Sequence, residues 1–459
     1  MNFQSVWNTK SIWKNQSWAP IEWITIVRSH KNYHQITLHI KDKPELGEWQ
    51  KQGANLTQTL FKHINTHSKI YVELSCEQEP SSEECCAFWR GFWLTMDSIT
   101  RDMSFQEREV IRVKTPLEVC FNRYHEVCDK ERIWAYAVWW VRSLQEAPEN
   151  QRPLVKFVRW LQHWLRNLDG VSGKIMKNPR ELTGLKAFAG GMGGNCYFVD
   201  YEYKPRNSSE KQLIGLIGKG VAYDAGGMAL KPCKSMKLMK MDYSGGLVAF
   251  AVFRTSAYLQ QKQPLVCLIP LTLNLMTTPN TLKPSDVIPL LKNKKTIEVV
   301  NPDAEGRVLL AEASLYAQKY YPKMHEVILL GTITSQIDKI GHGIYSGLFV
   351  KSTNRNEQEI RDAWEISGNA VQEFLWNIPL DSEMKPLLLS NVADYLNVNN
   401  TVDADLLWSG LFLSVFWEKR GTWSYIDLGG TMDSPFSQAW APNTGRGVGV
   451  EMVRTYLEC

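Results

Sequence analysis

Acidic and basic side chains gather in two short stretches of this 459-residue chain. The first stretch, residues 218–232, is rich in glycine and contains Lys219, Asp224 and Lys231, and Asp242 follows it closely. Glycines in such a loop let the backbone approach a ligand closely. The two lysines flank an acid, so the stretch could hold either an anion or a metal ion.

The second stretch contains Asp303, Glu305, Gly306 and Arg307. In an extended segment, side chains two residues apart point to the same side, so the two carboxylates would repel each other unless a cation lay between them. Gly306 allows a tight turn into a helix, and Arg307 presents a rigid fork of donors that suits a planar oxyanion. The structural alternative is that the acids only start a helix, at the positive end of its dipole, and pair with Arg307.

Together the two stretches supply four acids on loops that follow predicted strands: Asp224, Asp242, Asp303 and Glu305. Carboxylates that converge without histidine form an oxygen-rich set of ligands, which suits a pair of divalent ions. Water bound to such ions becomes a nucleophile near neutral pH. The sequence therefore predicts hydrolysis at two metal ions.

Other site patterns are weaker. Residues 215–220 do not match the phosphate-binding pattern GxxxxGK[ST], because the spacing is short and no Ser or Thr follows the lysine. The glycines at 190–194 lack the spacing of a dinucleotide site, so we interpret them as a turn. His63 and His67 are four residues apart but have no acidic third ligand beside them, so we interpret them as core or surface histidines.

Composition excludes several classes of protein. The formal net charge is +4, which gives no broad electrostatic footprint for nucleic acid or anionic lipid. The longest apolar run, residues 264–276, is too short to span a membrane, and the polar start of the chain does not resemble a secretory signal. The nine cysteines include no CxxC pair, which favours a reducing cytoplasm. The 18 tryptophans are expected in the core or in an oligomer interface.

The elements that position these residues are predicted to form two domains, residues 1–150 and 151–459. Alternating apolar residues near 24–40 and 70–74 predict three strands, and helix-start residues at 81–84 precede a helix over 87–94. These elements indicate a small N-terminal α/β domain. Turn residues near 148–153 mark its end.

The second domain is predicted to be larger. After a helical stripe of apolar residues over 154–168, strand-like runs alternate with helix-capable segments. These runs occupy residues 213–217, 265–269, 296–300 and 327–330. The alternation predicts a mixed sheet with helices on both faces. In such folds the site usually lies at the carboxyl ends of the strands.

The motifs also resemble those of a known family. GKGVAYDAGG, LKP, MDYSGG and NPDAEGR are similar to the signatures of the cytosolic leucine aminopeptidases, and further similar segments reach residues 445–450. Within that family, residues 85–92 most resemble the peptidase B branch. The resemblance implies a catalytic domain that holds two zinc or manganese ions.

The resemblance also implies roles for individual residues. The implied metal ligands are Lys219, Asp224, Asp242, Asp303 and Glu305. Asp224 and Glu305 would bridge the two ions, and Lys219 would bind as an uncharged amine. Lys231 would stabilise the oxyanion of the tetrahedral intermediate, and Arg307 would hold a bicarbonate ion that takes the proton from the attacking water.

The remaining implications concern the substrate and the assembly. One metal ion would bind the free α-amine of a peptide, which restricts cleavage to the first peptide bond. Met239 and Thr332 match positions of the pocket for the first side chain. Members of the family form homohexamers. The leading hypothesis is a cytoplasmic di-metal aminopeptidase that acts on peptides in intracellular peptide turnover. The alternatives are a DNA-binding or architectural member of the family and a two-metal phosphoesterase, although the low net charge argues against nucleic acid as a partner.

Overall fold

The computed structural model describes most of the chain. The described residues are 24–29, 33–40, 46–63, 69–76, 81–99, 125–190, 194–206, 212–276, 281–334, 336–341, 343–399, 404–435 and 441–459. They fall into two compact units, Met1–Tyr136 with Gln438–Pro442, and Ala137–Ser437 with Asn443–Cys459. Within the described ranges, no helix is both long enough and apolar enough to cross a lipid bilayer.

The described residues of the first unit include a three-stranded sheet and the long helices α2 and α3. Strand β1 (Ile24–Ser29) is antiparallel to β2 (Tyr33–Ile40), and β3 (Lys69–Cys76) is parallel to β2. Helices α2 (Leu46–His63) and α3 (Ser82–Ile99) pack on each other. The three strands that the alternation of apolar residues predicted are confirmed.

Local sequence explains where α3 begins. The backbone N–H of Glu84 donates to the Ser81 hydroxyl at 3.2 Å, and the Glu84 carboxylate accepts from the Ser81 N–H at 2.6 Å. This reciprocal pair is a capping box, which satisfies backbone donors that a helix start leaves unpaired. The helix start predicted at residues 81–84 is confirmed.

Glycines let α2 and α3 approach closely. A Cβ atom on Gly53 would lie 1.9 Å from the carbonyl oxygen of Phe88, and one on Gly91 would lie 1.8 Å from that of Gln50. Such distances leave no room for a larger residue, because the obstacle is backbone on both sides. The buried rings of Phe88 and Trp89 fill the space beside this crossing.

Helix α5 (His125–Glu146) crosses the division between the units, which falls between Tyr136 and Ala137. It leads to η2 (Glu149–Gln151) and α6 (Leu154–Leu165), whose apolar stripe is buried as its spacing predicted. The assignment of residues 1–150 and 151–459 as domains stays a prediction.

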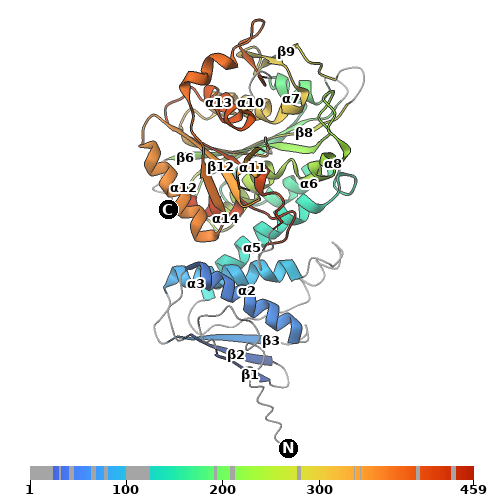
Figure 1. Ribbon diagram of the computed structural model, residues 1–459. Helices are drawn as coiled ribbons and strands as arrows, with labels where there is room; N and C mark the ends of the chain where they lie inside the picture. Colours follow the sequence, from blue (N-terminus) through green and yellow to red (C-terminus); the bar gives the residue numbers. More distant parts are fainter. Residues whose placement is uncertain are drawn as a thin grey trace, which may run out of the picture. The chain divides into compact units, whose positions relative to one another are not determined.

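A nine-stranded mixed sheet forms the centre of the second unit (Figure 1). Its strands are β4 (Val171–Lys177), β5 (Tyr197–Tyr203), β6 (Leu213–Gly218), β7 (Gly220–Asp224), β8 (Leu265–Asn274), β11 (Met324–Gly331), β12 (Tyr345–Ser352), β13 (Phe374–Asn377) and β15 (Thr422–Asp427). The order is β13-β12-β15-β11-β6-β8-β5-β4, and β7 pairs with β8. Strands β8, β6, β11 and β15 are parallel neighbours, whereas β5 and β12 run antiparallel to β8 and β15. The predicted mixed sheet is confirmed.

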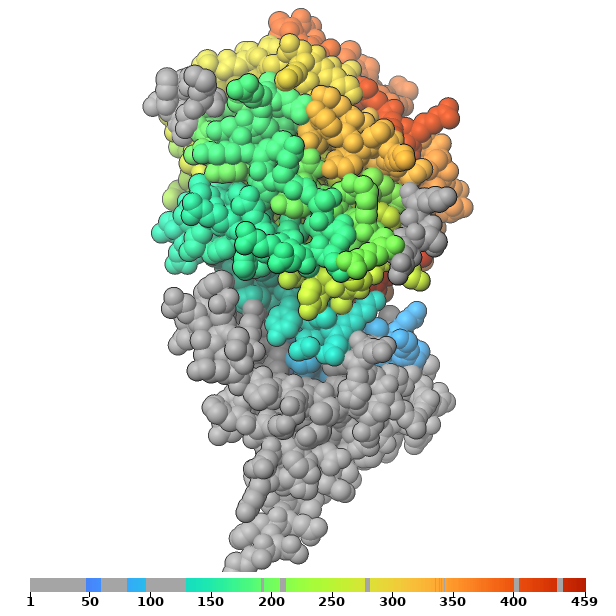
Figure 2. All heavy atoms as spheres, turned by 180° about the vertical axis from the view of Figure 1, so that it is seen from behind, coloured from blue at the N-terminus to red at the C-terminus, as the bar shows by residue number. Residues whose placement is uncertain are grey.

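The other elements of this unit cover or extend the sheet. A small sheet comprises β9 (Asp286–Leu290), β10 (Lys295–Val299) and β14 (Tyr395–Leu396). The helices are α7 (Thr183–Phe188), α8 (Cys233–Met236), η3 (Lys237–Met241), α9 (Ser244–Tyr258), η4 (Pro302–Ala304), α10 (Glu305–Tyr320), α11 (Gln336–Gly341), α12 (Glu357–Val371), η5 (Ser382–Leu388), α13 (Asp405–Val415), η6 (Gly429–Thr431) and α14 (Val450–Glu458). Seen from behind, stretches far apart in the sequence lie side by side on the surface of this unit (Figure 2).

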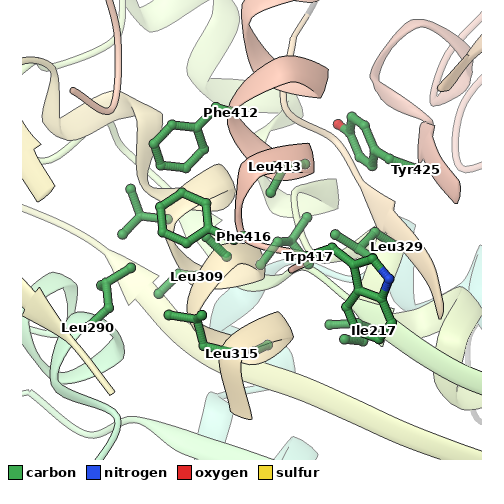
Figure 3. Packing of buried hydrophobic residues seen from close by; sticks show 14 of the residues in the cluster. Ile217, Leu290, Leu309, Leu315, Leu329, Phe412, Leu413, Phe416, Trp417 and Tyr425 are labelled. Carbon is green, nitrogen blue, oxygen red and sulfur yellow. The ribbon is translucent and has the colours of Figure 1, made fainter. Parts of the chain in front are cut away.

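The core of the second unit lies between the sheet and the helices on each side of it. Ile217 and Leu329 point from β6 and β11 into a cluster that also contains Leu309 of α10 and Leu413 of α13 (Figure 3). Because successive strand residues point to opposite faces, the intervening residues face α9, which contacts both strands. For this reason β6 is apolar along its whole length, and β8 and β11 are apolar along most of theirs. Helices on both faces were predicted and are confirmed.

The parallel strands end at one edge of the sheet. The last residues of β6, β8, β11 and β15 are Gly218, Asn274, Gly331 and Asp427. Lys219 lies between β6 and β7, Asp224 ends β7, and Lys231 and Asp242 follow β7. Asp303 lies in η4, and Glu305 and Arg307 lie at the start of α10. The fold therefore gathers the two charged stretches where the chain pattern predicted a site.

Candidate metal centre

Lys219 is the residue between β6 and β7, and its backbone is held from two sides. Its N–H donates to the carbonyl of Leu330 at 2.9 Å, and its carbonyl accepts from the N–H of Gly246 at 2.7 Å. The side chain is buried, with 3% of the residue exposed. The backbone therefore fixes the direction in which the amine enters the centre.

The Lys219 amine lies among acceptors from three loops. Its Nζ is 2.7 Å from Asp242 Oδ2 and 3.0 Å from Glu305 Oε1, and it donates to the carbonyl of Thr332 at 3.0 Å. Burial by itself would lower the pKa of this amine, but the charges of Asp242, Glu305 and Asp224 outweigh it and raise the pKa. Without a metal ion the amine is therefore an ammonium group.

Lys231 forms a second set of ion pairs at the mouth of the centre. Its Nζ is 2.8 Å from Asp224 Oδ2 and 2.6 Å from Asp303 Oδ1. Burial opposes the charge of Lys231, but Asp224 and Asp303 raise its pKa above the ordinary value. The side chain is partly exposed, so this ammonium group can face a molecule that enters from solvent.

Three carboxylates converge at the base of the centre. Asp224 ends β7, Asp242 follows η3 and Glu305 begins α10, and one oxygen from each lies within 4.8 Å of the others. All three residues are buried. Burial is the largest cause that raises the pKa of Asp242 and of Glu305, and the charge of Asp224 raises both further. A divalent cation would remove this penalty, because it stabilises the charged form of each acid.

Asp303 lies beside this cluster, in η4. It contacts Lys231 rather than joining the group of three acids within 4.8 Å. Burial and the charge of Asp224 raise its pKa to about 6. Of the four predicted acids, the structure thus brings three together and places the fourth next to the lysine at the mouth.

The chemistry of this donor set fits metal ions. Asp242 Oδ2, Asp303 Oδ1 and Glu305 Oε1 are buried, and a lysine nitrogen lies within 3.0 Å of each. A divalent cation would stabilise the same buried carboxylates that the lysine ammonium groups now pair with. Clustered carboxylate oxygens are ligands for hard divalent cations.

Asn274 is a residue of this centre that sequence reasoning missed. It ends β8, and its Nδ2 donates to Asp224 Oδ1 at 2.8 Å and lies 3.0 Å from Glu305 Oε2. The amide therefore orients two of the three clustered carboxylates. The available signal was a buried polar residue at the end of an apolar run, directly beside the predicted site.

Thr332 and Met239, predicted to line the substrate pocket, each form a hydrogen bond with Asp242. The Thr332 hydroxyl donates to Asp242 Oδ1 at 2.8 Å, so this side chain contacts a candidate metal ligand directly. Met239 lies in η3 and is half-buried. Their role in the pocket stays a prediction.

Arg307 points away from solvent in α10. Its Nη2 donates to Asp405 Oδ1 at 2.7 Å and its Nη1 donates to the carbonyl of Asn397 at 3.2 Å. Only 1% of the residue is exposed. Asp405 and Asn397 were not among the predicted site residues.

Two weaker sequence patterns lie largely outside the residues that the structure describes. These are the histidine pair, of which neither the side chain of His63 nor any part of His67 is described, and most of the glycine run at 190–194.

The fold and the site together define an α/β protein with a cluster of acids that could hold metal ions at the ends of parallel strands. The model of the cytosol aminopeptidase family's catalytic domain matches residues 139–454. The chain belongs to this family, which confirms the family resemblance of the motifs. The peptidase B branch is not specified by these similarities.

Curated relatives have similar sequences over the same region. A probable cytosol aminopeptidase of Rickettsia massiliae (strain Mtu5) is 32% identical over 339 residues, and the cytosol aminopeptidase of Rickettsia prowazekii (strain Madrid E) is 31% identical over 339 residues. Each alignment covers 72% of this chain and 65% of the relative. The chain thus spans less than two thirds of the length of these relatives.

Solved structures share the fold. The bottromycin maturation enzyme BotP in complex with Mn has a TM-score of 0.77 and 21% sequence identity, over 90% of this chain and 88% of that chain. A second structure of BotP has a TM-score of 0.76 at the same identity, over 90% of this chain and 87% of that chain. At this identity the likeness concerns the fold alone.

Proposed function

We propose that this protein is a metal-dependent aminopeptidase that releases N-terminal amino acids from peptides. The observation that carries the proposal is the cluster of Asp224, Asp242 and Glu305, whose oxygens approach within 4.8 Å inside the matched catalytic domain. Membership of the cytosol aminopeptidase family supports the reaction class. Peptides are therefore the proposed substrates.

Two divalent ions would be held by the residues of the two charged stretches. The proposed ligands are Lys219, Asp224, Asp242, Asp303 and Glu305. Bound ions would lower the pKa of water and polarise the scissile carbonyl. Lys219 would have to lose its proton to bind, and the buried negative charge that now raises its pKa would be balanced by the ions instead.

The other residues of the chain have supporting roles. Lys231 would direct its ammonium group toward the oxygen of the substrate carbonyl, where negative charge develops during attack. Its partial exposure at the mouth of the centre supports this role. Thr332 holds Asp242, and Asn274 holds Asp224, so both keep the carboxylates oriented.

Manganese is the ion that the donor set favours. Four of the five proposed ligands are carboxylates, and carboxylate oxygens suit Mn²⁺ better than they suit softer ions. The structurally similar BotP is described in complex with Mn, which supports the same choice here. Zinc is the alternative, because it also binds carboxylates and nitrogen.

The experiment measures hydrolysis of an amino-acid amide and of a short peptide with added Mn²⁺ and after complete removal of metal by a chelator. Activity should disappear with the metal and return with Mn²⁺. Unchanged turnover in the metal-free protein would refute the proposal. Glu305→Ala should abolish activity, whereas Glu365→Ala, which removes an exposed carboxylate on α12, should leave it unchanged.

The assembly and location follow from the same family membership and remain proposals. We propose a homohexamer, which sedimentation analysis of the purified chain would test, and a cytoplasmic location in intracellular peptide turnover. No observation on the described residues favours DNA binding or phosphate-ester hydrolysis over peptide hydrolysis.

A further inference from the structure

Arg307 is a buried cation that already has a partly exposed neighbour of opposite charge, Asp405. It is among the largest side chains that are fully buried, and its Nη2 lies 2.7 Å from Asp405 Oδ1. A guanidinium group cannot lose its proton inside a protein, so its burial requires an anion nearby. The structure provides that anion from the chain itself.

Neighbouring contacts fix the position of Asp405. It is the first residue of α13, where a carboxylate is stabilised by the positive end of the helix. The next residue, Leu406, is buried, and its N–H donates to Gln336 Oε1 at 2.8 Å. Helix α13 also packs on α10, which carries Arg307. The carboxylate is therefore held at the guanidinium by packing.

The second acceptor of Arg307 is fixed in the same way. The carbonyl of Asn397 accepts from Arg307 Nη1 at 3.2 Å and from Trp408 Nε1 at 3.3 Å. Arg307 Nε is buried and makes no hydrogen bond. Nη1 and Nη2 thus each donate one N–H to a group of this chain, and Asp405 balances the charge of the guanidinium.

We infer that Asp405 supplies the anion that pairs with Arg307, so this protein does not take up bicarbonate or another external oxyanion at that position. The inference rests on the proposed function for its place beside the metal centre, and it replaces the bicarbonate that the family resemblance implied. A carboxylate and bicarbonate are both planar oxyanions of single negative charge, so Asp405 already supplies the charge that bicarbonate would bring to Nη2. Asp405 is then a positioning residue that sets the charge and orientation of Arg307.

The test measures anion binding rather than catalysis. The full chain is loaded with Mg²⁺, which is diamagnetic, and mixed with ¹³C-labelled bicarbonate. Line broadening of the ¹³C signal reports binding, and the thermal unfolding midpoint is compared in bicarbonate and in chloride at equal pH and ionic strength. The wild-type protein should show no broadening and the same midpoint in both salts.

Asp405→Gly should open the position. We expect it to broaden the ¹³C signal and to gain a few degrees in unfolding midpoint with bicarbonate, because a ligand that binds only the folded state stabilises it. Asp405→Glu keeps the charge and should behave as the wild type. Asp381→Gly is the matched control, because it also removes an aspartate from the start of a helical segment, η5, that does not contact Arg307.

Either of two results would overturn the inference: binding of bicarbonate by the wild type that Arg307→Met abolishes, or a folded Asp405→Gly protein that gains no binding. If Asp405→Gly fails to fold, the wild-type and Asp405→Glu measurements decide the question alone. Since no peptide is hydrolysed in these experiments, failure of the proposed aminopeptidase activity would be seen separately.

Discussion

Gly306 leaves the space that the Lys219 side chain occupies. It is the second residue of α10, and a Cβ atom at this position would lie 2.4 Å from Lys219 Cε and 2.7 Å from its Nζ. Ordinary van der Waals contact begins at 3.4 Å, so Gly306→Ala forces the end of the lysine to move by about 1 Å. The obstacle is a side chain rather than backbone, so α10 itself can stay in place.

The change in the free energy of unfolding has two contributions, a lost contact of Lys219 and a gain in helix propensity. The Lys219 amine now lies 2.7–3.0 Å from Asp242, Glu305 and the carbonyl of Thr332, so a movement of about 1 Å breaks at least one contact. Losing one charge-assisted hydrogen bond costs about 1.5–3 kcal/mol. Alanine is about 1 kcal/mol better than glycine inside a helix. The free energy of unfolding should therefore fall by about 0.5–2 kcal/mol.

The affinity for Mn²⁺ should fall as well. Displacing a group that binds or orients a metal ligand typically costs about 10–100-fold in affinity. Isothermal titration with Mn²⁺ measures the affinity, and urea denaturation followed by circular dichroism measures the stability. Gly306→Ala should fold, bind Mn²⁺ about 10–100-fold more weakly and lose the stated stability.

A double-mutant cycle isolates the contact. Lys219→Ala removes Cδ, Cε and Nζ, the atoms that the new methyl group would meet. In that background Gly306→Ala should no longer destabilise the protein and should gain about 1 kcal/mol from helix propensity. The reasoning is refuted if Gly306→Ala binds Mn²⁺ as the wild type does, or if its cost persists in the Lys219→Ala background.

Other predictions address pH, orientation of the ligands and the first unit. In the metal-free protein, burial raises the pKa of Glu305 from 4.5 to about 8, so the folded state holds a proton that the unfolded chain has released. The free energy of unfolding should thus fall as the pH rises through this window, and saturating Mn²⁺ should abolish the trend, as urea denaturation at several pH values would show. Asn274→Ala should weaken Mn²⁺ binding about 10-fold by freeing Asp224, and isothermal titration that shows wild-type affinity would contradict this. Gly53→Ala should cost about 1–3 kcal/mol, because its methyl group would meet the backbone at Phe88, yet leave Mn²⁺ affinity unchanged. Equal stability by denaturation would refute that account of the α2–α3 crossing.

Much of the fold could be predicted because the relevant interactions are local. Alternation along β1–β3 and the apolar runs of β6, β8 and β11 reflect burial on one or both faces of a sheet. The start of α3 depends on Ser81 and Glu84, which are three residues apart. Patterns of this kind depend on residues that are close in the sequence, so they can be recognised without the tertiary structure.

The acids and lysines of the centre were also predictable, because each lies in a compact motif near a strand end. Asn274 and Asp405 were not, since they reach the centre across 50 residues, from Asn274 to Asp224, and across 98 residues, from Asp405 to Arg307. No local pattern encodes such a contact. Only the packing of β8 beside β7 and of α13 against α10 brings these side chains into place.

The amino-acid sequence by itself determined which chemical groups this protein can bring to a site, because its carboxylates and lysines lie in two compact motifs. Only the tertiary structure decided which of those groups contact each other. Lys219 forms ion pairs with Asp242 and Glu305. Lys231 pairs with Asp224 and Asp303, and Arg307 pairs with Asp405. Charge pairing in a buried site depends on distances between elements, and these distances arise only when the helices and strands pack together.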